Sequence, residues 1–239
     1  MTTNAGLLPG SEGEHRAQEM FGTTKRALAF YNLQVLDRLT PLMCDFIRAQ
    51  EMVFVATADA RGHADSSVRF GPPGFVHVLD ERTLIYPEYR GNGVMASVGN
   101  MLENPNIGLL FVDFQRETVG LHVNGKARVV EKAELLGYFV NGGGADDDQS
   151  SLFEKLVLAP DVIEPLIEAT LTRGGRHPER WIAVEVEEAY IHCSKHIPKF
   201  QKLDKTIHWG TDDAQLKGGD AFKAKGYDRP WRQSGTDDT

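Results

Sequence analysis

The stretch SSVRFGPPGFVHVLDERTLIYPEYRGNGVMAS, residues 66–97, decides how the rest of the chain is interpreted. Short apolar segments around Val68 and over residues 84–86 are typical of strands, and both lead toward the turn RGNG at residues 90–93. A helical pattern follows, which places backbone N–H groups and the positive end of a helix dipole next to an arginine. The turn therefore predicts an anion site, with Arg69 as a second cationic contact. An ordinary tight turn with a solvated arginine is the alternative interpretation.

Alternation of apolar and polar residues predicts a chain that is mainly β with flanking helices. Strands are expected at residues 52–58, through Ser67 and Val68, at 74–79, 83–86, 106–114 and 118–131, and over 181–186 continuing through 189–193. Helices are expected at residues 17–29, 31–39, 42–50 and 94–103, and helical spacing interrupted by Pro160 and Pro165 covers 152–172. Short strands in succession with one inserted helix favour a closed antiparallel barrel over a parallel sheet.

The composition is that of a globular protein with a substantial core, because 41% of its 239 residues are hydrophobic. A formal net charge of −8 argues against general nucleic-acid binding, so any anion site has to be local. The two cysteines, Cys44 and Cys193, are too few and too far apart for a disulfide framework. Neither a signal-peptide pattern nor a run of about 18 apolar residues is present, so we expect no membrane span and a cytoplasmic location.

The chain divides into three expected regions. Residues 1–50 form an N-terminal arm with helices that pack on the barrel, residues 51–200 form the barrel domain, and residues 201–239 form a polar C-terminal arm. The acidic, glycine-rich stretch 141–151 is interpreted as a flexible loop. A calcium site is the weaker interpretation of this stretch, because the ligand spacing and terminal Glu of an EF-hand are missing.

Two local patterns raise the question of other chemistry. Residues 63–66, His-Ala-Asp-Ser, resemble part of a nucleophilic triad, but on a turn and strand they are more simply a polar edge. Residues 192–196 contain two histidines and a cysteine, yet neighbours on a strand point to opposite faces and no second cluster completes a tetrahedral zinc site. No metal site is expected.

Taken together, these motifs resemble the pyridoxamine 5′-phosphate oxidase-like, FMN-binding split-barrel family over about residues 52–199. Residues 189–195 resemble the closing strand of a subgroup of that family. The resemblance is strongest at a set of central positions: Arg69, Gly74-Phe75, Asp80 to Leu84, Tyr86 to Gly93, Ser97 and Asn104-Pro105.

The resemblance implies a six-stranded antiparallel split β-barrel that forms a homodimer, with two flavin sites shared across the dimer interface. It also implies which side chains hold the FMN phosphate: Ser67 and Arg69 on the second strand, and Arg90, Asn92 and Ser97 beyond the fourth.

Further implied contacts involve the flavin ring. Tyr86 and Pro87 are implied to lie beside the isoalloxazine, with their backbone groups at its polar edge, and the partner chain is implied to contribute Lys195 or His192. In the C-terminal arm, the tryptophans at positions 209 and 231 either cap the flavin or pack on the partner subunit.

The chain departs from true pyridoxamine phosphate oxidases at three motifs. Arg69 is followed by Phe-Gly-Pro-Pro-Gly instead of the family's Arg-x-x-x-Leu-Lys segment, and RGNG with extra residues replaces a Ser-Arg-Lys phosphate turn. The C-terminal arm contains Asp-Arg-Pro-Trp-Arg, with no clear counterpart of the substrate-binding Arg-x-His segment. FMN binding is therefore better supported than oxidation of pyridoxamine phosphate.

The expected function is that of an FMN-dependent oxidoreductase acting on an unidentified small molecule. No protein acid or base is assigned, because a flavin carries out the electron transfer itself. Relatives in the family also bind deazaflavin or haem, and haem would require a histidine ligand such as His122 or His192. A flavin-binding protein without turnover is the remaining alternative.

Overall fold

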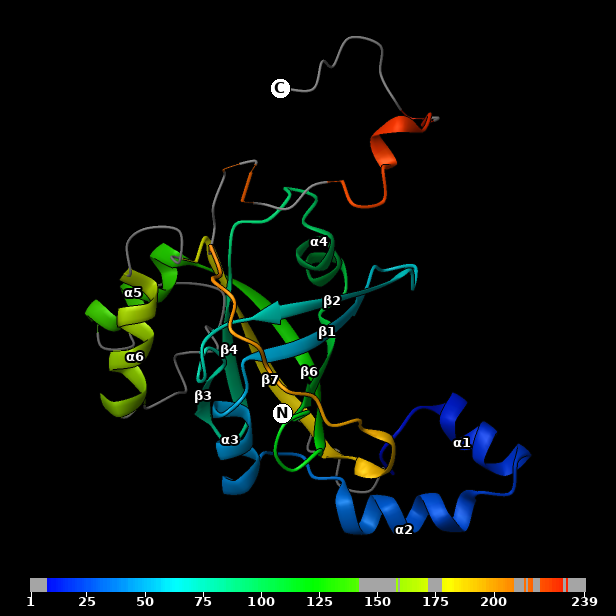
Figure 1. Ribbon diagram of the computed structural model, residues 1–239. Coiled ribbons are helices and arrows are strands. Elements are labelled where there is room, and N and C mark those ends of the chain that lie inside the picture. Colours follow the sequence, from blue (N-terminus) through cyan, green and yellow to red (C-terminus); the bar gives the residue numbers. More distant parts are fainter. Residues whose placement is uncertain are drawn as a thin grey trace.

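A seven-stranded antiparallel sheet organises the chain in the computed structural model (Figure 1). The structure describes residues 8–141, 158, 160–171, 178–208, 213, 215–216, 220–229 and 231. The strand order is β2-β1-β5-β6-β7-β4-β3. The strands are β1 (Met52–Ala58), β2 (Ala64–Phe70), β3 (His77–Asp80), β4 (Thr83–Glu88), β5 (Asn106–Val112), β6 (Gly120–Glu131) and β7 (Arg180–His192).

Helices flank this sheet. α4 contacts β1, β2 and β6, α3 contacts β3, and α5 and α6 contact each other as well as β6 and β3 respectively. The helices are α1 (Glu12–Met20), α2 (Thr24–Gln34), α3 (Pro41–Arg48), α4 (Ala96–Glu103), α5 (Lys132–Asn141) and α6 (Pro160–Leu171), with short 3₁₀ turns η2 (Ser194–His196) and η3 (Ala224–Gly226). The prediction of a mainly β chain with flanking helices is confirmed.

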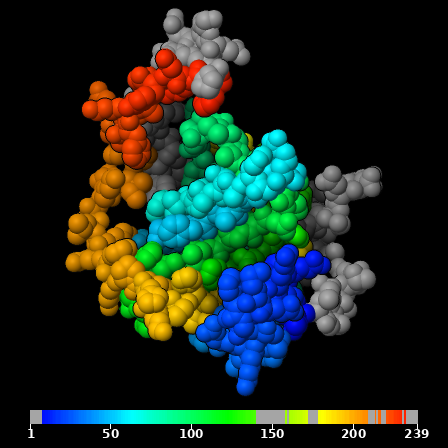
Figure 2. Space-filling model, turned by 90° about the vertical axis from the view of Figure 1, so that its right-hand side faces the viewer, coloured from blue at the N-terminus to red at the C-terminus, as the bar shows by residue number. Residues whose placement is uncertain are grey.

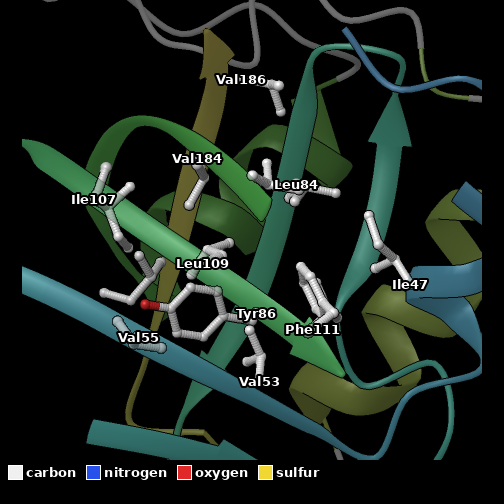
Figure 3. Close-up of a cluster of buried hydrophobic side chains, with 14 of the residues drawn as sticks. Ile47, Val53, Val55, Leu84, Tyr86, Ile107, Leu109, Phe111, Val184 and Val186 are labelled. Carbon is white, nitrogen blue, oxygen red and sulfur yellow. The ribbon is translucent and has the colours of Figure 1, made fainter. Parts of the chain in front are cut away.

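Strand alternation creates two apolar layers. On β1, Val53 and Val55 are buried while their neighbours are more exposed, and they join one large cluster with side chains of β4, β5, β6 and β7 (Figure 3). On the opposite face, Trp181 and Ala183 of β7 belong to a second cluster that Leu135 of α5 and Leu166 of α6 cover. A sheet buried on both faces explains why residues 84–87 of β4 and 181–184 of β7 form continuous apolar runs in sequence.

The strand count and the closure differ from expectation. The residue pattern predicts seven strands in a closed barrel and the resemblance implies a split barrel of six; the sheet has seven strands, with β3 added at one end by the β3–β4 hairpin, and it is not closed. Within the described residues, β2 at the other end pairs through its backbone with β1 alone, and β3 pairs with β4 alone. The barrel is therefore split, and side chains bridge the gap between β2 and β4.

One irregularity joins the two longest strands. Asn124 pairs with Glu188 but the next residue, Gly125, pairs with Val186, so β7 carries one extra residue, Glu187, at a β-bulge. The bulge brings the two backbones so close that a Cβ built on Gly125 would lie 1.9 Å from the carbonyl oxygen of Glu185. Only glycine fits this position without a shift of the backbone.

The N-terminal helices begin and end at other residues than expected. One helix was expected over 17–29, but the chain breaks between α1 and α2 at Gly22, whose φ is +64°. The expected helix over 31–39 ends at Gln34, because the residues that follow bond to other elements: Leu36 pairs with Ala189 of β7, and the Leu39 N–H donates to Glu81. Neither α1 nor α2 contains a buried residue.

Two further stretches test the helix predictions. α5 occupies residues that carried no helix prediction, and α6 confirms helical structure for the second half of the expected 152–172 segment, with Pro165 inside it. Almost all of the acidic stretch 141–151 lies outside the described residues. In the part of the chain that the structure describes, no helix combines the length and apolarity that crossing a bilayer requires.

Residues 197–208 leave the end of β7 and run along one side of the molecule (Figure 2, orange). Phe200 stacks on Phe114 with ring centroids 5.0 Å apart, and its N–H donates to the Phe114 carbonyl over 2.7 Å. The Lys202 ammonium then contacts both carboxylate oxygens of Glu51 at 2.6 and 2.7 Å. These contacts attach the first part of the C-terminal arm to the sheet, whereas Trp231 is exposed and Trp209 lies outside the described residues.

Candidate functional site

Three polar side chains of β2 face the interior side of the split barrel. Asp65, Ser67 and Arg69 alternate along the strand, so they lie on one face. Their partners on β1 include Val53 and Val55, both of which belong to the buried core. β2 therefore contributes a polar row at the edge of the large apolar cluster.

Hydrogen bonds join this row to α4 in one direction. Arg69 Nη1 donates to Ser67 Oγ at 2.9 Å, Ser67 and Ser97 are 3.1 Å apart through their hydroxyls, and Ser97 donates to Asp65 Oδ2 at 2.9 Å. A hydroxyl carries one proton, and Ser97 gives its proton to Asp65, so Ser67 is the donor in the contact between the two serines. The chain runs from the guanidinium through both hydroxyls to a carboxylate.

A carboxylate from across the split completes the cluster. Arg69 Nε donates to Glu88 Oε2 of β4 at 2.8 Å. The two side chains are only 18% and 14% exposed, so this ion pair is better shielded from solvent than the surface pairs of the chain. Because β2 and β4 share no backbone pairing, the ion pair is the polar link between the two sides of the split.

α4 positions Ser97 at the start of its first turn. The residue before the helix, Met95, has a φ of +57° and gives the helix no side-chain cap, while Ser97 is only 5% exposed. Asn100, one turn later, donates to the buried Thr57 hydroxyl at 3.0 Å and fixes the helix on β1. An uncapped helix start beside two hydroxyls and a guanidinium is an arrangement that favours an anion.

The RGNG turn leads into this helix. Asn92 Oδ1 accepts a hydrogen bond from the Val94 N–H at 3.0 Å, and Gly93 has a φ of +81°. Arg90 is exposed on the same turn. Of the side chains implied to hold the FMN phosphate, the structure thus brings Ser67, Arg69 and Ser97 into one hydrogen-bonded cluster, while Asn92 stabilises its own turn.

Tyr86 and Pro87 are both buried on β4. Figure 3 shows the Tyr86 ring extending from β4 across the barrel interior toward Val55 of β1, so the side chain belongs to the core. In the described residues β3 pairs with β4 only as far as Ile85, so beyond this residue β4 is flanked on one side, by β7. The backbone of Tyr86 and Pro87 thus lies on a strand edge.

The phenol of Tyr86 has no hydrogen-bond partner among the described residues, and complete burial raises its pKa. We expect Tyr86→Phe to raise the free energy of unfolding by about 1 kcal/mol, because a buried hydroxyl without a partner costs about 1–3 kcal/mol. Thermal and denaturant unfolding of the two proteins measure this difference. The matched control is Tyr190→Phe, which removes a hydroxyl bonded to Asn124 and should lower stability. A less stable Tyr86→Phe protein would contradict the prediction.

Lys195 and His192 lie at the opposite end of β7 from the cluster. Glu88 pairs with Arg180 at the first residue of β7, and a strand of 13 residues spans about 40 Å. Lys195 is exposed in η2, beyond the last residue of the strand. Within one chain the structure therefore does not bring Lys195 to Arg69.

The two histidines named as haem ligands contact each other. His122 Nε2 and His192 Nδ1 are 2.8 Å apart, and the His122 ring stacks on Tyr190 with centroids 4.7 Å apart. Partial burial, and secondarily the charge of His192, lower the pKa of His122. Each ring has thus one nitrogen committed to the other ring. The described residues contain no group of three His, Cys, Asp or Glu side chains that could hold a metal ion.

The triad-like residues 63–66 do not assemble. His63 Nδ1 contacts Asp59 at 2.8 Å, while Asp65 contacts Ser97. The structure instead adds Asp65 and Glu88, which sequence reasoning did not assign to the site. The available signal was their spacing, since Asp65 lies two residues before Ser67 and Glu88 lies two residues after Tyr86 on strands whose alternate residues share a face.

One family model matches more than half of the chain. The family model described as pyridoxamine 5′-phosphate oxidase matches residues 39–193. A solved structure of HupZ from Group A Streptococcus is 22% identical, with a TM-score of 0.38, and the match covers 63% of this chain and 91% of that one. A putative pyridoxamine 5′-phosphate oxidase from Lactobacillus delbrueckii is 19% identical, with a TM-score of 0.38 and coverages of 66% and 99%. HutZ, a haem storage protein from Vibrio cholerae, is 13% identical, with a TM-score of 0.35 and coverages of 65% and 94%. Among curated proteins, none matches the sequence.

Proposed function

Because the chain belongs to the pyridoxamine 5′-phosphate oxidase family, we propose that it is an FMN-binding, flavin-dependent oxidoreductase that acts on a small molecule. The observation that carries the proposal is the cluster of Arg69, Ser67 and Ser97 at the start of α4, beside the split of the barrel. The proposal keeps the homodimeric assembly and the cytoplasmic location expected from the sequence.

The donors of the cluster suit a phosphate group. A guanidinium offers a planar fork of N–H groups, two hydroxyls can turn toward an oxygen, and the uncapped start of α4 adds unpaired backbone N–H groups. Asp65 and Glu88 count against an anion, but both accept hydrogen bonds that a phosphate oxygen would accept equally well. Ser67, Arg69 and Ser97 would therefore hold the phosphate.

The neighbouring elements suit the rest of a flavin. When bound, FMN supplies hydride and single-electron chemistry, for which the protein has to provide position and electrostatics. The edge of β4 at Tyr86 and Pro87 offers backbone groups to a planar ring, while the Tyr86 side chain stays in the core. The chain would thus orient the cofactor mainly through its backbone.

The visible spectrum of the purified protein tests the cofactor. Flavin bands, with FMN identified by mass spectrometry, support the proposal. A Soret band would favour haem, and a mass matching a deazaflavin would favour the other alternative, so either result would refute FMN as the ligand. Reduction of the bound flavin by NADH or NADPH, followed by reoxidation with candidate acceptors, separates an oxidoreductase from a flavin-binding protein without turnover.

We expect Arg69→Ala to weaken FMN binding by about 10- to 100-fold, because a hydrogen bond to a charged group contributes about 1.5–3 kcal/mol. Quenching of flavin fluorescence on titration measures the affinity, and circular dichroism checks the fold. The matched control is Arg48→Ala, which removes an arginine from an exposed ion pair with Asp45 on α3 and should leave the affinity unchanged. Equal affinities of the wild-type and Arg69→Ala proteins would refute the assigned phosphate site.

A further inference from the structure

The side-chain donors that join the cluster already have acceptors inside it, and Arg69 Nη1 makes a further, longer contact of 3.4 Å with the Val68 carbonyl. Arg69 Nε donates to Glu88, Arg69 Nη1 to Ser67, Ser67 to Ser97, and Ser97 to Asp65. A carboxylate stands at each end of this series. The carboxylates of Glu88 and Asp65 therefore accept the hydrogen bonds that the oxygens of a ligand anion would otherwise accept.

Both sides of the Arg69 guanidinium that could bind a phosphate are already partly engaged. An arginine can grip a phosphate through the Nε and Nη2 side or through the Nη1 and Nη2 end, in both cases with two parallel N–H groups. Glu88 engages one nitrogen of the first pair and Ser67 engages one nitrogen of the second. Ser67 can rotate its hydroxyl and become a donor to phosphate, whereas Glu88 and Asp65 carry no proton to offer when ionised.

The charges of the cluster also disfavour a bound anion. Arg69 contributes one positive charge, while Asp65 and Glu88 contribute two negative charges when ionised, all three within one set of contacts. Arg69 and Glu88 are less than one-fifth exposed, so solvent screens their mutual interaction only partly. An incoming phosphate would meet a guanidinium that a carboxylate has already neutralised.

We propose that Glu88 and Asp65 are built-in competitors for the phosphate position, so that a phosphate-bearing ligand binds by displacing the Arg69–Glu88 ion pair and leaves as that pair re-forms. The inference rests on the proposed function for its ligand, FMN. It makes FMN an exchangeable ligand whose affinity the chain itself holds down. Because the ion pair links β2 to β4, loading of the site and opening of the split are coupled.

The test compares two flavins on matched variants. Glu88→Gln and Asp65→Asn keep the size of each side chain and an acceptor oxygen but remove the negative charge. We expect each variant to bind FMN about tenfold more tightly than the wild type, because a neutral amide holds the donor that it contacts, Arg69 or Ser97, less strongly than a carboxylate does and releases it more readily to phosphate. Riboflavin, which lacks the phosphate, should bind all three proteins equally. Asp45→Asn, from an exposed ion pair on α3, controls for the change in net charge.

A double-mutant cycle identifies the group for which Glu88 competes. If the carboxylate acts by occupying Arg69, then Glu88→Gln should gain little FMN affinity in an Arg69→Ala background. Weaker FMN binding by Glu88→Gln would overturn the inference and make Glu88 a residue that positions the guanidinium. An equal gain for riboflavin, or a gain that persists without Arg69, would overturn it as well.

Inorganic phosphate separates this inference from the proposed function. If no variant binds FMN but phosphate raises the melting temperature of Glu88→Gln and not that of the wild type, the FMN proposal fails and the competition stands. If the wild type binds FMN and Glu88→Gln binds it with the same affinity, the function stands and the competition fails. If Glu88→Gln gains neither FMN affinity nor stabilisation by phosphate, the inference is refuted whatever the wild type binds.

Discussion

Replacing Gly125 with alanine is expected to lower the free energy of unfolding by about 3 kcal/mol or more, the upper range for an added methyl group in a packed site. The new Cβ would lie 1.9 Å from the Glu185 carbonyl oxygen and 2.9 Å from its carbon. Both are backbone atoms of β7, so no flexible side chain can move away. The two longest strands of the sheet would have to separate at the bulge, where twelve residues of β6 face thirteen of β7. Denaturant unfolding followed by circular dichroism measures the loss.

The matched control is Gly99→Ala in α4. Apart from its chain neighbours and the backbone of its own helix, a Cβ at this position meets no atom within 4 Å. Alanine should therefore stabilise the protein by about 0.5–1 kcal/mol through its higher helix propensity. A Gly125→Ala protein as stable as the wild type would show that β6 and β7 pair without the bulge, in another register.

The strands could be predicted because their signal is local. Alternation in residues 120–131 and the apolar run in β4 indicate strands with no knowledge of their partners. The pairing order could not be read in the same way, since β1 lies between β2 and β5, and β7 lies between β6 and β4. Contacts between elements far apart in sequence decide this order.

The helix errors have separate physical causes. Gly22 carried a visible signal for a helix end, but the apolar spacing continued through it, and the expected helix ran across the break. α5 begins directly after β6, so no loop composition separates the two elements in sequence. Residues 35–39 have helical spacing but lie outside the helix, because Leu36 bonds to Ala189 and Leu39 to Glu81 in place of helical hydrogen bonds.

In the candidate site, too, local patterns could be predicted from the sequence and long-range contacts could not. The resemblance to the family implied Ser67, Arg69 and Ser97; alternation along β2 puts the first two on one face, and α4 begins one residue before the third. Spacing places Glu88 on the same face as Tyr86, but it does not predict the contact with Arg69, because in the described residues β2 and β4 share no backbone pairing from which the contact could be read. Any role of Lys195 depends on a second subunit, which keeps it a prediction.

Acid is expected to destabilise the fold through His77. This residue lies on β3 with its ring 5.6 Å from that of Trp181, beside the apolar cluster that α5 and α6 cover. Burial disfavours the charged imidazolium and lowers the pKa of His77 from 6.5 to about 4. Between these two values the unfolded chain binds a proton that the folded protein does not, so the free energy of unfolding falls as the pH drops from 6.5 to 4.

The expected loss across this range is about 3 kcal/mol, since one pKa unit corresponds to about 1.4 kcal/mol. Below pH 4 both states bind the proton and the contribution of His77 levels off.

His77→Phe keeps a ring against Trp181 and removes the titrating group, so its stability should decline less steeply between pH 6.5 and 4. The slope of the free energy of unfolding against pH should be smaller than that of the wild type by up to the equivalent of one bound proton. Denaturant unfolding at half-unit pH steps measures both slopes, and subtracting them removes the carboxylates that titrate in both proteins. His196→Gln, at an exposed position in η2, is the control and should keep the wild-type slope. Parallel curves for His77→Phe and the wild type would mean that the folded protein protonates His77 as readily as the unfolded chain does, and that burial on β3 does not exclude the charge.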